Sequence, residues 1–433
     1  MDFKNVVSAA AKSVSCSSFF LLLFTFYLSS FLAQAARNPP PPPKQIYHVV
    51  NLSSLHTKPY CESPRTGSEL GSGKIRMASR NGPCSPHKKM SSYESLFTEK
   101  ANSDGSFAGY KEFFVTIELG TPQKQFTLLV DTGSDSTWVG CKPCSTGCGP
   151  KDHLFDPSKS STYVNGSCRP STDGDDGQFS FGCGQEIIQD DDGYSSGDYD
   201  GILGLGRGHL SLPSQGGTNF QKFSYCLPKR TSKEGYLVFG NEAQAKSSSS
   251  KPQFTPLLPP PKNLPGKYIQ ESYYFVELIG MSVAGKRLDV APSVFNSPGT
   301  IIDSGTSITL LPQEAYSALT TAFNQSMASK YTVAPSIADI PLDTCYNVDT
   351  SNVIVPVITF HFKGMSAKGE IDVELRQSGI VLVPPSKPNL VCLGFAQQKD
   401  GLAIIGNHQQ RQMAMSFDLQ GNSLGFGTNN CDE

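Results

Sequence analysis

The sequence predicts an all-β protein made of two similar lobes that are related by a pseudo-twofold axis. Three observations predict this fold. Glycine and proline are abundant, with 40 and 31 among 433 residues. From Phe113 onward, short apolar or alternating runs are separated by turn residues, and a stretch of the first half returns in the second half. Charged residues make up only 17% and the net charge is −2, which gives no basic surface for nucleic acid.

The repeat consists of a strand, a glycine turn and a second apolar strand that ends in an aspartate. In the first half, residues 113–120 precede Leu128-Leu129-Val130-Asp131-Thr132-Gly133-Ser134. In the second half, residues 273–280 precede Ile301-Ile302-Asp303-Ser304-Gly305-Thr306. Each half then adds a later apolar run that ends in glycine. Two halves that each place an aspartate at a strand end predict a shared site between two lobes.

Asp131 and Asp303 are the predicted catalytic pair. A carboxylate at the end of a buried strand is costly unless it is satisfied, and two facing carboxylates resist joint ionisation, so they share a proton. Such a pair can activate a water against a peptide carbonyl and protonate the leaving group. Hydroxyls would hold the outer carboxylate oxygens, and glycines would let the backbone approach closely. The expected supporting residues are Ser134, Thr306, Gly133 and Gly305.

From about residue 109 to residue 431, the chain resembles the pepsin-like aspartic proteases, and among them the plant nepenthesin- and nucellin-like branch. The motifs that carry the resemblance are residues 119–122, 131–135 with Trp138, 181–184, 204–207, 223–227, 303–306 and 405–407. A single Asp-Thr-Gly also forms ordinary turns. Two such motifs, each followed by a later apolar run that ends in glycine, are specific for this family. The resemblance implies that Asp131 and Asp303 form the dyad and that a peptide or protein is the substrate. No cofactor and no metal are expected.

The first 35 residues are expected to be a signal peptide. Two lysines supply positive charge, residues 19–32 form an apolar core, and Ala33-Gln34-Ala35 is a small-x-small cleavage site. A membrane anchor is the alternative. It is disfavoured because the apolar core is shorter than the roughly 20 residues of a spanning helix. We therefore expect a secreted protein, extracellular or vacuolar, with no membrane anchor after signal cleavage.

The chain is expected to comprise four regions and to be a monomer. Residues 1–35 are the signal peptide, and residues 36–106 are a flexible or propeptide-like region that lacks a sustained period. Residues 107–265 form the N-terminal lobe and residues 266–433 the C-terminal lobe. The candidate glycosylation sites are Asn51, Asn165 and Asn324.

Twelve cysteines in a secreted chain predict disulfides. The resemblance implies two pairs, Cys345 with Cys392 and Cys226 with Cys431. The first lobe holds five further cysteines, an odd number that cannot all pair: Cys141, Cys144, Cys148, Cys168 and Cys183. Zinc binding by the Cys-x2-Cys-x3-Cys run, with Cys168 or His153 as a fourth ligand, is the less favoured alternative.

One departure from the family pattern lies between Tyr163 and Phe179. Relatives have several dozen residues here, including a hairpin flap with a tyrosine, whereas this chain has only residues 164–178. The segment holds one proline, three glycines and three aspartates, with no tyrosine. A hairpin with two strands of about 5–6 residues would need nearly all of it. We therefore expect the flap to be absent.

Two functions are predicted. The first is a secreted aspartic endopeptidase that hydrolyses peptide bonds with a water activated between Asp131 and Asp303. The alternative is a catalytically impaired pepsin-like binding or inhibitor-type protein, similar to the cereal xylanase inhibitors that share this fold. Both aspartates and both flanking hydroxyls favour the enzyme. The short segment favours the alternative, because a flap excludes water and clamps substrate.

Overall fold

The structure is a computed structural model. It describes residues 47–51, 74–79, 113–145, 147–148, 152–166, 178–186, 199–218, 220–228, 235–240, 243, 252–262, 264, 270–335, 342–348, 353–365, 369–384, 387–399 and 401–428. The expected signal peptide, Cys168 and Cys431 lie outside these residues. No described helix is long and apolar enough to cross a membrane.

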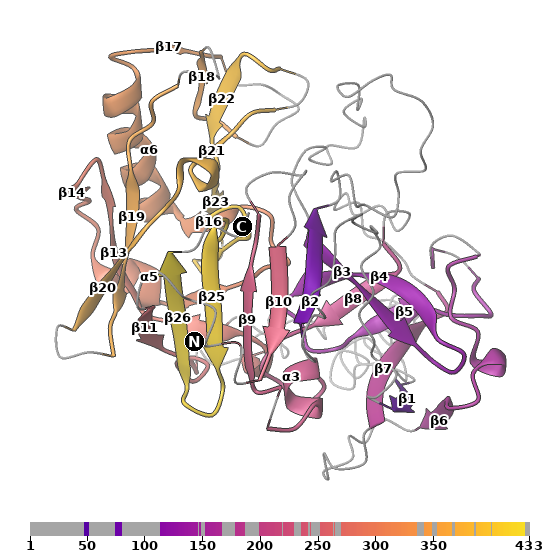
Figure 1. The fold of residues 1–433 in the computed structure, drawn as a ribbon. Coiled ribbons are helices and arrows are strands. Elements are labelled where there is room, and N and C mark those ends of the chain that lie inside the picture. Colours follow the sequence, from indigo (N-terminus) through magenta and orange to yellow (C-terminus); the bar gives the residue numbers. More distant parts are fainter. Residues whose placement is uncertain are drawn as a thin grey trace, which may run out of the picture. The chain divides into compact units, whose positions relative to one another are not determined.

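The largest sheet of the described residues has 13 strands, in the order β11-β26-β25-β9-β10-β2-β3-β4-β8-β5-β7-β1-β6. Its strands are β1 (Tyr47–Asn51), β2 (Lys74–Ser79), β3 (Phe113–Leu119), β4 (Lys124–Asp131), β5 (Trp138–Gly140), β6 (Val164–Gly166), β7 (Gln178–Gly184), β8 (Gly201–Gly204), β9 (Lys222–Cys226), β10 (Gly235–Phe239), β11 (Gln253–Pro256), β25 (Met413–Asp418) and β26 (Ser423–Thr428). Strand β25 pairs antiparallel with β9, and the yellow β25 lies beside the pink β9 in Figure 1. One sheet therefore crosses the expected boundary between residues 265 and 266.

The described residues of the second half also form three smaller sheets. A five-stranded sheet contains β12 (Tyr274–Val276), β15 (Thr300–Ile302), β24 (Ala403–Ile405), β16 (Thr309–Pro312) and β23 (Phe395–Gln398). A four-stranded sheet contains β14 (Lys286–Arg287), β13 (Leu278–Val283), β19 (Ile358–Lys363) and β20 (Glu370–Glu374). The last contains β17 (Thr332–Val333), β18 (Cys345–Asn347), β22 (Leu390–Leu393) and β21 (Val381–Leu382).

In the part of the chain that the structure describes, helices are short except for one. The α-helices are α3 (Leu212–Gln215), α5 (Pro292–Asn296) and α6 (Gln313–Met327), and the 3-10 turns are η3 (Pro157–Lys159), η4 (Gln270–Ser272) and η5 (Gln377–Gly379). Helix α6 buries one apolar side, formed by Ala315, Tyr316, Leu319, Phe323 and Met327. These residues recur at the spacing of one helix face, so packing of that face stabilises α6.

The same four-strand arrangement surrounds each expected catalytic aspartate. Strand β4 runs parallel to β8, β8 pairs antiparallel with β5, and β5 runs parallel to β7. In the second half, β15, β24, β16 and β23 are related in the same three ways. An antiparallel strand precedes each set, β3 beside β4 and β12 beside β15. The duplicated motif is thus a duplicated topology, and the predicted all-β, two-lobed fold is confirmed.

A continuous hydrophobic core extends across strands of both halves. Phe223 on β9 stacks on Phe417 of β25, with ring centroids 4.5 Å apart. Tyr274 of β12 also contacts Phe417, at 4.7 Å between centroids. Strand β3 is buried almost throughout, which explains its nearly continuous apolar sequence. The strands that carry the aspartates therefore pack on one hydrophobic core that both halves share.

Two segments of residues 36–106, for which the sequence predicts a flexible region, are strands of the large sheet. Strand β1 pairs with both β6 and β7, and β2 pairs with both β10 and β3. Residues 74–77 of β2 alternate between polar and apolar side chains, but neither segment belongs to a sustained period. Each pairs through its backbone with strands on both sides, a driving force that composition does not reveal.

Candidate active site

Asp131 and Asp303 stand at matching positions of the two repeats. Asp131 is the last residue of β4, Asp303 directly follows β15, and both side chains are partly exposed. The Gly133 amide donates to Oδ1 of Asp131 over 2.8 Å, and the Ser134 hydroxyl donates to Oδ2 over 2.5 Å. Each aspartate is thus held through both oxygens by its own motif.

The second repeat reproduces these contacts. The Gly305 amide donates to Oδ1 of Asp303 over 2.8 Å, and the Thr306 hydroxyl donates to Oδ2 over 2.6 Å. Hydrogen bonds to both oxygens fix the plane of a carboxylate and favour its charged form. The four residues expected to support the pair all contact the aspartate of their own motif.

Each motif glycine lies against the aspartate of the opposite repeat. A β-carbon added to Gly133 would lie 2.6 Å from Oδ1 of Asp303. A β-carbon on Gly305 would lie 2.3 Å from Oδ1 of Asp131 and 3.2 Å from Oδ1 of Asp303. No side chain fits at either position without moving a carboxylate. The glycines are therefore what allows the two carboxylates to approach each other.

Thr132 and Ser304 connect the two motifs directly. The Thr132 amide donates to Oγ of Ser304 over 3.0 Å, and the Ser304 amide donates to Oγ1 of Thr132 over 2.9 Å. Each hydroxyl also donates to a carbonyl of the opposite strand, that of Val130 or Ile302. Both residues are buried. Neither residue was predicted to belong to the site, although a hydroxyl follows the aspartate in both motifs.

The later apolar runs that end in glycine, one in each half, support the backbone of the aspartates. The Leu205 amide donates to the carbonyl of Asp131 over 2.8 Å, and the Asp303 amide donates to the carbonyl of Ile405 over 3.1 Å. Gly204 and Gly406 each donate an amide hydrogen bond to a threonine hydroxyl, at 3.1 and 3.2 Å. These paired contacts explain why both halves carry a second apolar-glycine run.

Electrostatics favour one shared proton on the pair. Burial raises the pKa of Asp131 from 3.8 to about 7, and the neighbouring charge of Asp303 adds to the increase. The hydrogen bonds from Ser134 and Gly133 lower the pKa, but by less. Two close carboxylates that cannot both ionise easily provide an acid and a base in one site. The arrangement can therefore assist attack by a water and protonation of a leaving group.

Two buried tyrosines that were not predicted from the sequence contact the residues that support the aspartates. The Tyr225 hydroxyl donates over 2.5 Å to Oε1 of Gln410, whose amide nitrogen donates to the carbonyl of Asp303 over 3.2 Å. The Tyr274 hydroxyl donates to the carbonyls of Leu205 and Gly206, over 2.7 and 2.9 Å. No local spacing signals these contacts, because the partners are far apart in the chain.

The expected flap position is only partly described. Val164–Gly166 forms β6 and Gln178–Gly184 forms β7, and residues 167–177 lie outside the described part. The two strands do not pair with each other, since β1 lies between them. Trp138 begins β5 and is partly buried next to Gly182. The described residues thus contain no β6–β7 hairpin.

The described cysteines of the first lobe form disulfides. Cys141 bonds to Cys183 and Cys144 bonds to Cys148, so the sulfurs of the zinc alternative are occupied. In the second lobe, Cys345 bonds to Cys392, and the two residues are opposite each other on β18 and β22. Cys226 is also disulfide-bonded. Its pairing with Cys431 and the state of Cys168 concern residues outside the described part and stay predictions.

Among the described residues, one group of side chains could hold a metal ion: His361, Glu370 and Asp372. These groups already satisfy one another. Arg287 donates to Glu370 over 2.6 Å, and His361 contacts Asp372 and Ser282, each over 2.6 Å. A dication would have to displace the Arg287 guanidinium. We therefore regard this group as an ion-pair network on β19 and β20.

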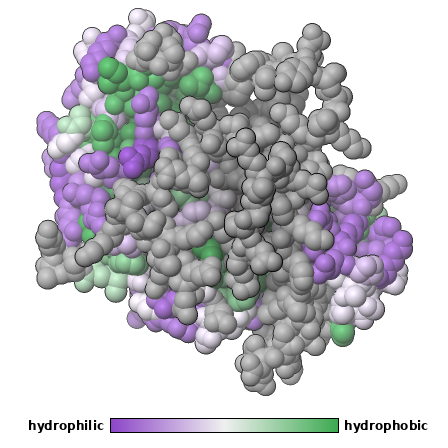
Figure 2. Space-filling model, in the orientation of Figure 1, coloured by the Kyte–Doolittle hydropathy of each residue, from purple (hydrophilic) through white to green (hydrophobic). Residues whose placement is uncertain are grey.

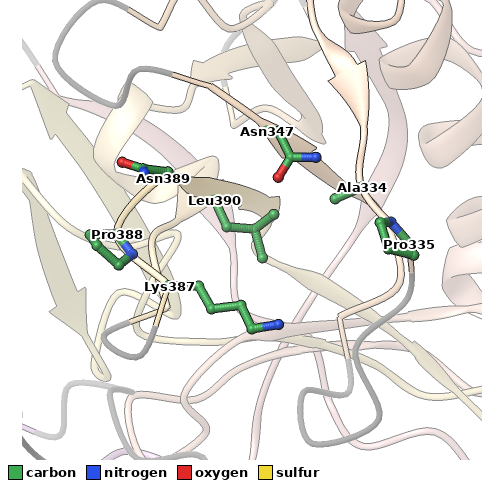
Figure 3. A pocket seen from close by; sticks show the side chains of 7 residues that line it. All are labelled: Ala334, Pro335, Asn347, Lys387, Pro388, Asn389 and Leu390. Atoms are coloured by element: carbon green, nitrogen blue, oxygen red, sulfur yellow. The ribbon is translucent and has the colours of Figure 1, made fainter.

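A cavity of about 320 Å³ lies beside β18 and β22 (Figure 3). It is lined by Ala334, Pro335, Asn347, Lys387, Pro388, Asn389 and Leu390. None of these residues contacts the dyad in the hydrogen bonds described above. Figure 2 shows hydrophobic residues on the viewed face near its upper left. Val333 and Val383 are about half exposed. The cavity carries no group that could perform the chemistry of the dyad.

The candidate glycosylation sites differ in their surroundings. Asn165 is exposed on β6, and Asn51 ends β1. Asn324 is exposed on α6, where its side-chain oxygen accepts a hydrogen bond from the Tyr346 hydroxyl. A glycan would attach to the nitrogen and leave that bond intact.

Comparisons with known proteins place the chain in a family. The family described as "Xylanase inhibitor N-terminal" matches residues 113–175 and 171–241, and "Xylanase inhibitor C-terminal" matches residues 273–428. Together these matches cover more than half of the chain. The chain belongs to the pepsin-like aspartic protease family.

Individual relatives agree with this placement. "Aspartyl protease AED1" of Arabidopsis thaliana is 35% identical over 375 residues, which cover 78% of this chain and 76% of the relative. "Aspartic proteinase nepenthesin-2" of Nepenthes gracilis is 29% identical over 372 residues, covering 75% and 79%. A solved structure titled "Crystal structure of edgp" matches with a TM-score of 0.56 and 20% identity, covering 83% of this chain and 95% of that one. That similarity concerns the fold alone.

Proposed function

We propose that this protein is a secreted aspartic endopeptidase, with Asp131 and Asp303 as its catalytic residues. One observation carries the proposal: two partly exposed carboxylates, one from each repeat, are held by matching hydrogen bonds from Gly133, Ser134, Gly305 and Thr306. Relatives named as aspartic proteases at 28–35% identity support the same activity.

In the proposed reaction, the pair holds one proton and a water between its carboxyls. The ionised carboxylate takes a proton from the water, whose oxygen attacks the carbonyl carbon of a peptide bond. The protonated carboxyl gives its proton to the carbonyl oxygen, forming a gem-diol. The carboxyl that took the proton from the water then gives it to the amide nitrogen, while the other carboxylate takes a proton from a gem-diol hydroxyl. The C–N bond breaks, a carboxylic acid and an amine are released, and the pair again holds one proton. The raised pKa of Asp131 keeps a proton available up to about pH 7, so the activity is expected at acidic pH.

The test uses the recombinant full-length chain after acid treatment, with a denatured protein as substrate. We expect cleavage that pepstatin inhibits at high concentration. We also expect a loss of at least about a thousandfold in Asp131→Asn and in Asp303→Asn, because each amide keeps the shape but cannot exchange the proton. Asp156→Asn is the matched control, since Asp156 caps η3 away from the dyad. Substantial cleavage by either dyad variant, or none by the wild-type chain, would contradict the proposal.

Secretion and processing belong to the same proposal. We propose that residues 1–35 are removed as a signal peptide and that cleavage between about Lys100 and Tyr110 removes the propeptide. N-terminal sequencing of the protein from culture medium tests both steps. A mature chain that starts at Ala36 would contradict a propeptide, and a protein that stays with the cells would contradict secretion.

A second candidate function is a binding or inhibitor-type protein on the same scaffold. It is favoured by the short segment between Tyr163 and Phe179. The description of the matching family as xylanase inhibitor is consistent with it. The cleavage assay separates the two functions, because a binding protein would give no pepstatin-sensitive product.

A further inference from the structure

Two buried tyrosines reach from one repeat to the backbone beneath the aspartate of the other repeat. Tyr225 lies on β9, a strand of the first half. Its hydroxyl donates to the Gln410 side chain, which in turn donates to the carbonyl of Asp303. Tyr274 lies on β12 of the second half, and its hydroxyl binds the loop that follows β8 in the first half. Both side chains are fully buried. The contacts are crossed, so each repeat supports the other.

The Tyr225 contact runs through one amide group. Gln410 donates from Nε2 to the carbonyl of Ile405 over 2.8 Å and to that of Asp303 over 3.2 Å. Because both partners are acceptors, the nitrogen must face them, which leaves Oε1 for a donor. The Tyr225 hydroxyl is that donor, at 2.5 Å. Without it, Oε1 would be a buried acceptor lacking its donor, and Gln410 would lose the orientation that holds Asp303.

The Tyr274 contact acts on the Asp131 motif. Its hydroxyl bridges the carbonyls of Leu205 and Gly206. The amides of these two residues donate to the carbonyls of Asp131 and Ser134, over 2.8 and 2.7 Å. A displacement of Tyr274 would therefore move the loop after β8, and with it the backbone of Asp131 and of Ser134.

A neighbouring residue strengthens the Tyr274 contact. The Ser272 hydroxyl donates to Oδ2 of Asp135 over 2.5 Å, and its carbonyl accepts from the Arg207 amide over 2.9 Å. The segment from Ser272 to Tyr274 is thus hydrogen-bonded to the loop after β8 at several points. Tyr274 also pairs with Ile302, which precedes Asp303. Movement of this segment would shift both aspartates.

We propose that Tyr225 and Tyr274 are positioning residues that hold the two aspartates in register across the repeats. The inference rests on the proposed function of Asp131 and Asp303. It goes further in assigning the relative placement of the carboxylates to two hydroxyls that do not touch substrate. The burial that raises the pKa of Asp131, and its proximity to Asp303, depend on this placement.

The experiment removes one hydroxyl at a time, in Tyr225→Phe and Tyr274→Phe. The first readout is the titration of Asp131, followed by NMR in protein labelled with ¹³C at aspartate carboxyls and assigned with Asp131→Asn. The wild-type midpoint is expected near 7. We expect each variant to move it toward 3.8, by about one unit or more, because looser lobes admit water and separate the charges. We also expect kcat to fall about tenfold with little change in KM.

The matched control is Tyr316→Phe. Tyr316 is also buried, and its hydroxyl donates to Asp343 over 2.5 Å, but it contacts neither aspartate of the pair. This variant is expected to lower the Tm while leaving the Asp131 titration unchanged. Ser272→Ala is a milder change on the Tyr274 segment, and a smaller shift in the same direction is expected. It keeps the inference testable if Tyr274→Phe does not fold.

The outcomes separate this inference from the proposed function. If both tyrosine variants lose stability as Tyr316→Phe does, but keep the wild-type titration and kcat, the positioning role is overturned. If the wild-type chain cleaves nothing, the proposed function fails. The titration still tests the placement of the carboxylates in that case, because it requires no turnover. A shifted midpoint in both variants supports the inference whether or not cleavage occurs.

Discussion

Thr132 and Ser304 each donate an amide hydrogen bond to the hydroxyl of the other, over 3.0 and 2.9 Å. They occupy the position after the aspartate in the two repeats, so the contact obeys the pseudo-twofold symmetry of the chain. It is the most direct link between the two motifs. Since both residues are buried, loss of either hydroxyl leaves an amide donor that water cannot easily reach.

The first prediction concerns this link. Thr132→Val and Ser304→Ala should each lower the free energy of unfolding by about 1–3 kcal/mol, because a buried donor loses its acceptor. The double variant should cost less than the sum, since the residues share the interaction. Urea unfolding of the three variants measures this. Thr132→Val combined with Thr300→Val is the control, because the Thr300 hydroxyl donates to the Phe295 carbonyl in its own half. Additive losses in Thr132→Val/Ser304→Ala would contradict the coupling.

The second prediction concerns Gly305. In Gly305→Ala, the new methyl would lie 2.3 Å from Oδ1 of Asp131, so the carboxylates must move apart. We expect kcat to fall at least a hundredfold, because a displacement of about 1 Å can have that effect. Gly285→Ala is the control, since its methyl would meet nothing within 4 Å. Its positive φ should cost only about 1 kcal/mol of stability. Equal kcat in Gly305→Ala and wild type would show that the carboxylates tolerate separation.

The third prediction follows from the pKa of Asp131. Its folded value is raised from 3.8 to about 7. Between about pH 4 and pH 7 the unfolded chain has therefore released a proton that the folded chain keeps. The contribution of Asp131 to stability is present below about pH 4 and is lost as the pH rises toward 7. Asp131→Asn cannot ionise, so the Tm of this variant should increase relative to the wild-type Tm as the pH rises through this range. Parallel Tm curves from pH 4 to pH 7 would rule out the raised pKa.

The fourth prediction concerns the short segment after Tyr163. If the flap is absent, bound peptide lacks one wall of contacts, and pepstatin should bind weakly even with an intact dyad. Grafting a relative's segment between Tyr163 and Phe179 should tighten pepstatin binding at least tenfold, as measured by calorimetry. A graft of equal length made of glycine and serine is the control. Tight binding by the unmodified chain would show that residues 164–178 are sufficient.

The local surroundings of Asp131 and Asp303 could be predicted from the sequence because their signal is local and repeated. Asp131 and Asp303 each lie in a four-residue motif after an apolar strand, and the structure gives both motifs the same hydrogen bonds. The two-lobed fold followed from the same repetition. Motifs of this kind can be found because every partner lies within a few residues of the aspartate.

The contacts that join the repeats could not be found in this way. Tyr225 and Gln410 are 185 residues apart, and neither belongs to a recognisable pattern. The β1 and β2 segments were missed for a different reason. The region that contains them shows no sustained period, and each segment forms a strand by pairing with neighbours on both sides. Tertiary context decides strand formation at such sites more than propensity does.

The pairing of β25 with β9 has a consequence for how the protein is made. Translation produces β9 long before residues 413–418 exist, so the β9 edge waits without its partner while most of the second half is synthesised. An unpaired edge beside apolar side chains is a template for aggregation. The nascent chain should therefore depend on chaperones until its last strands emerge. Chains that stop before Met413 should accumulate as aggregates, however well their first lobe is encoded.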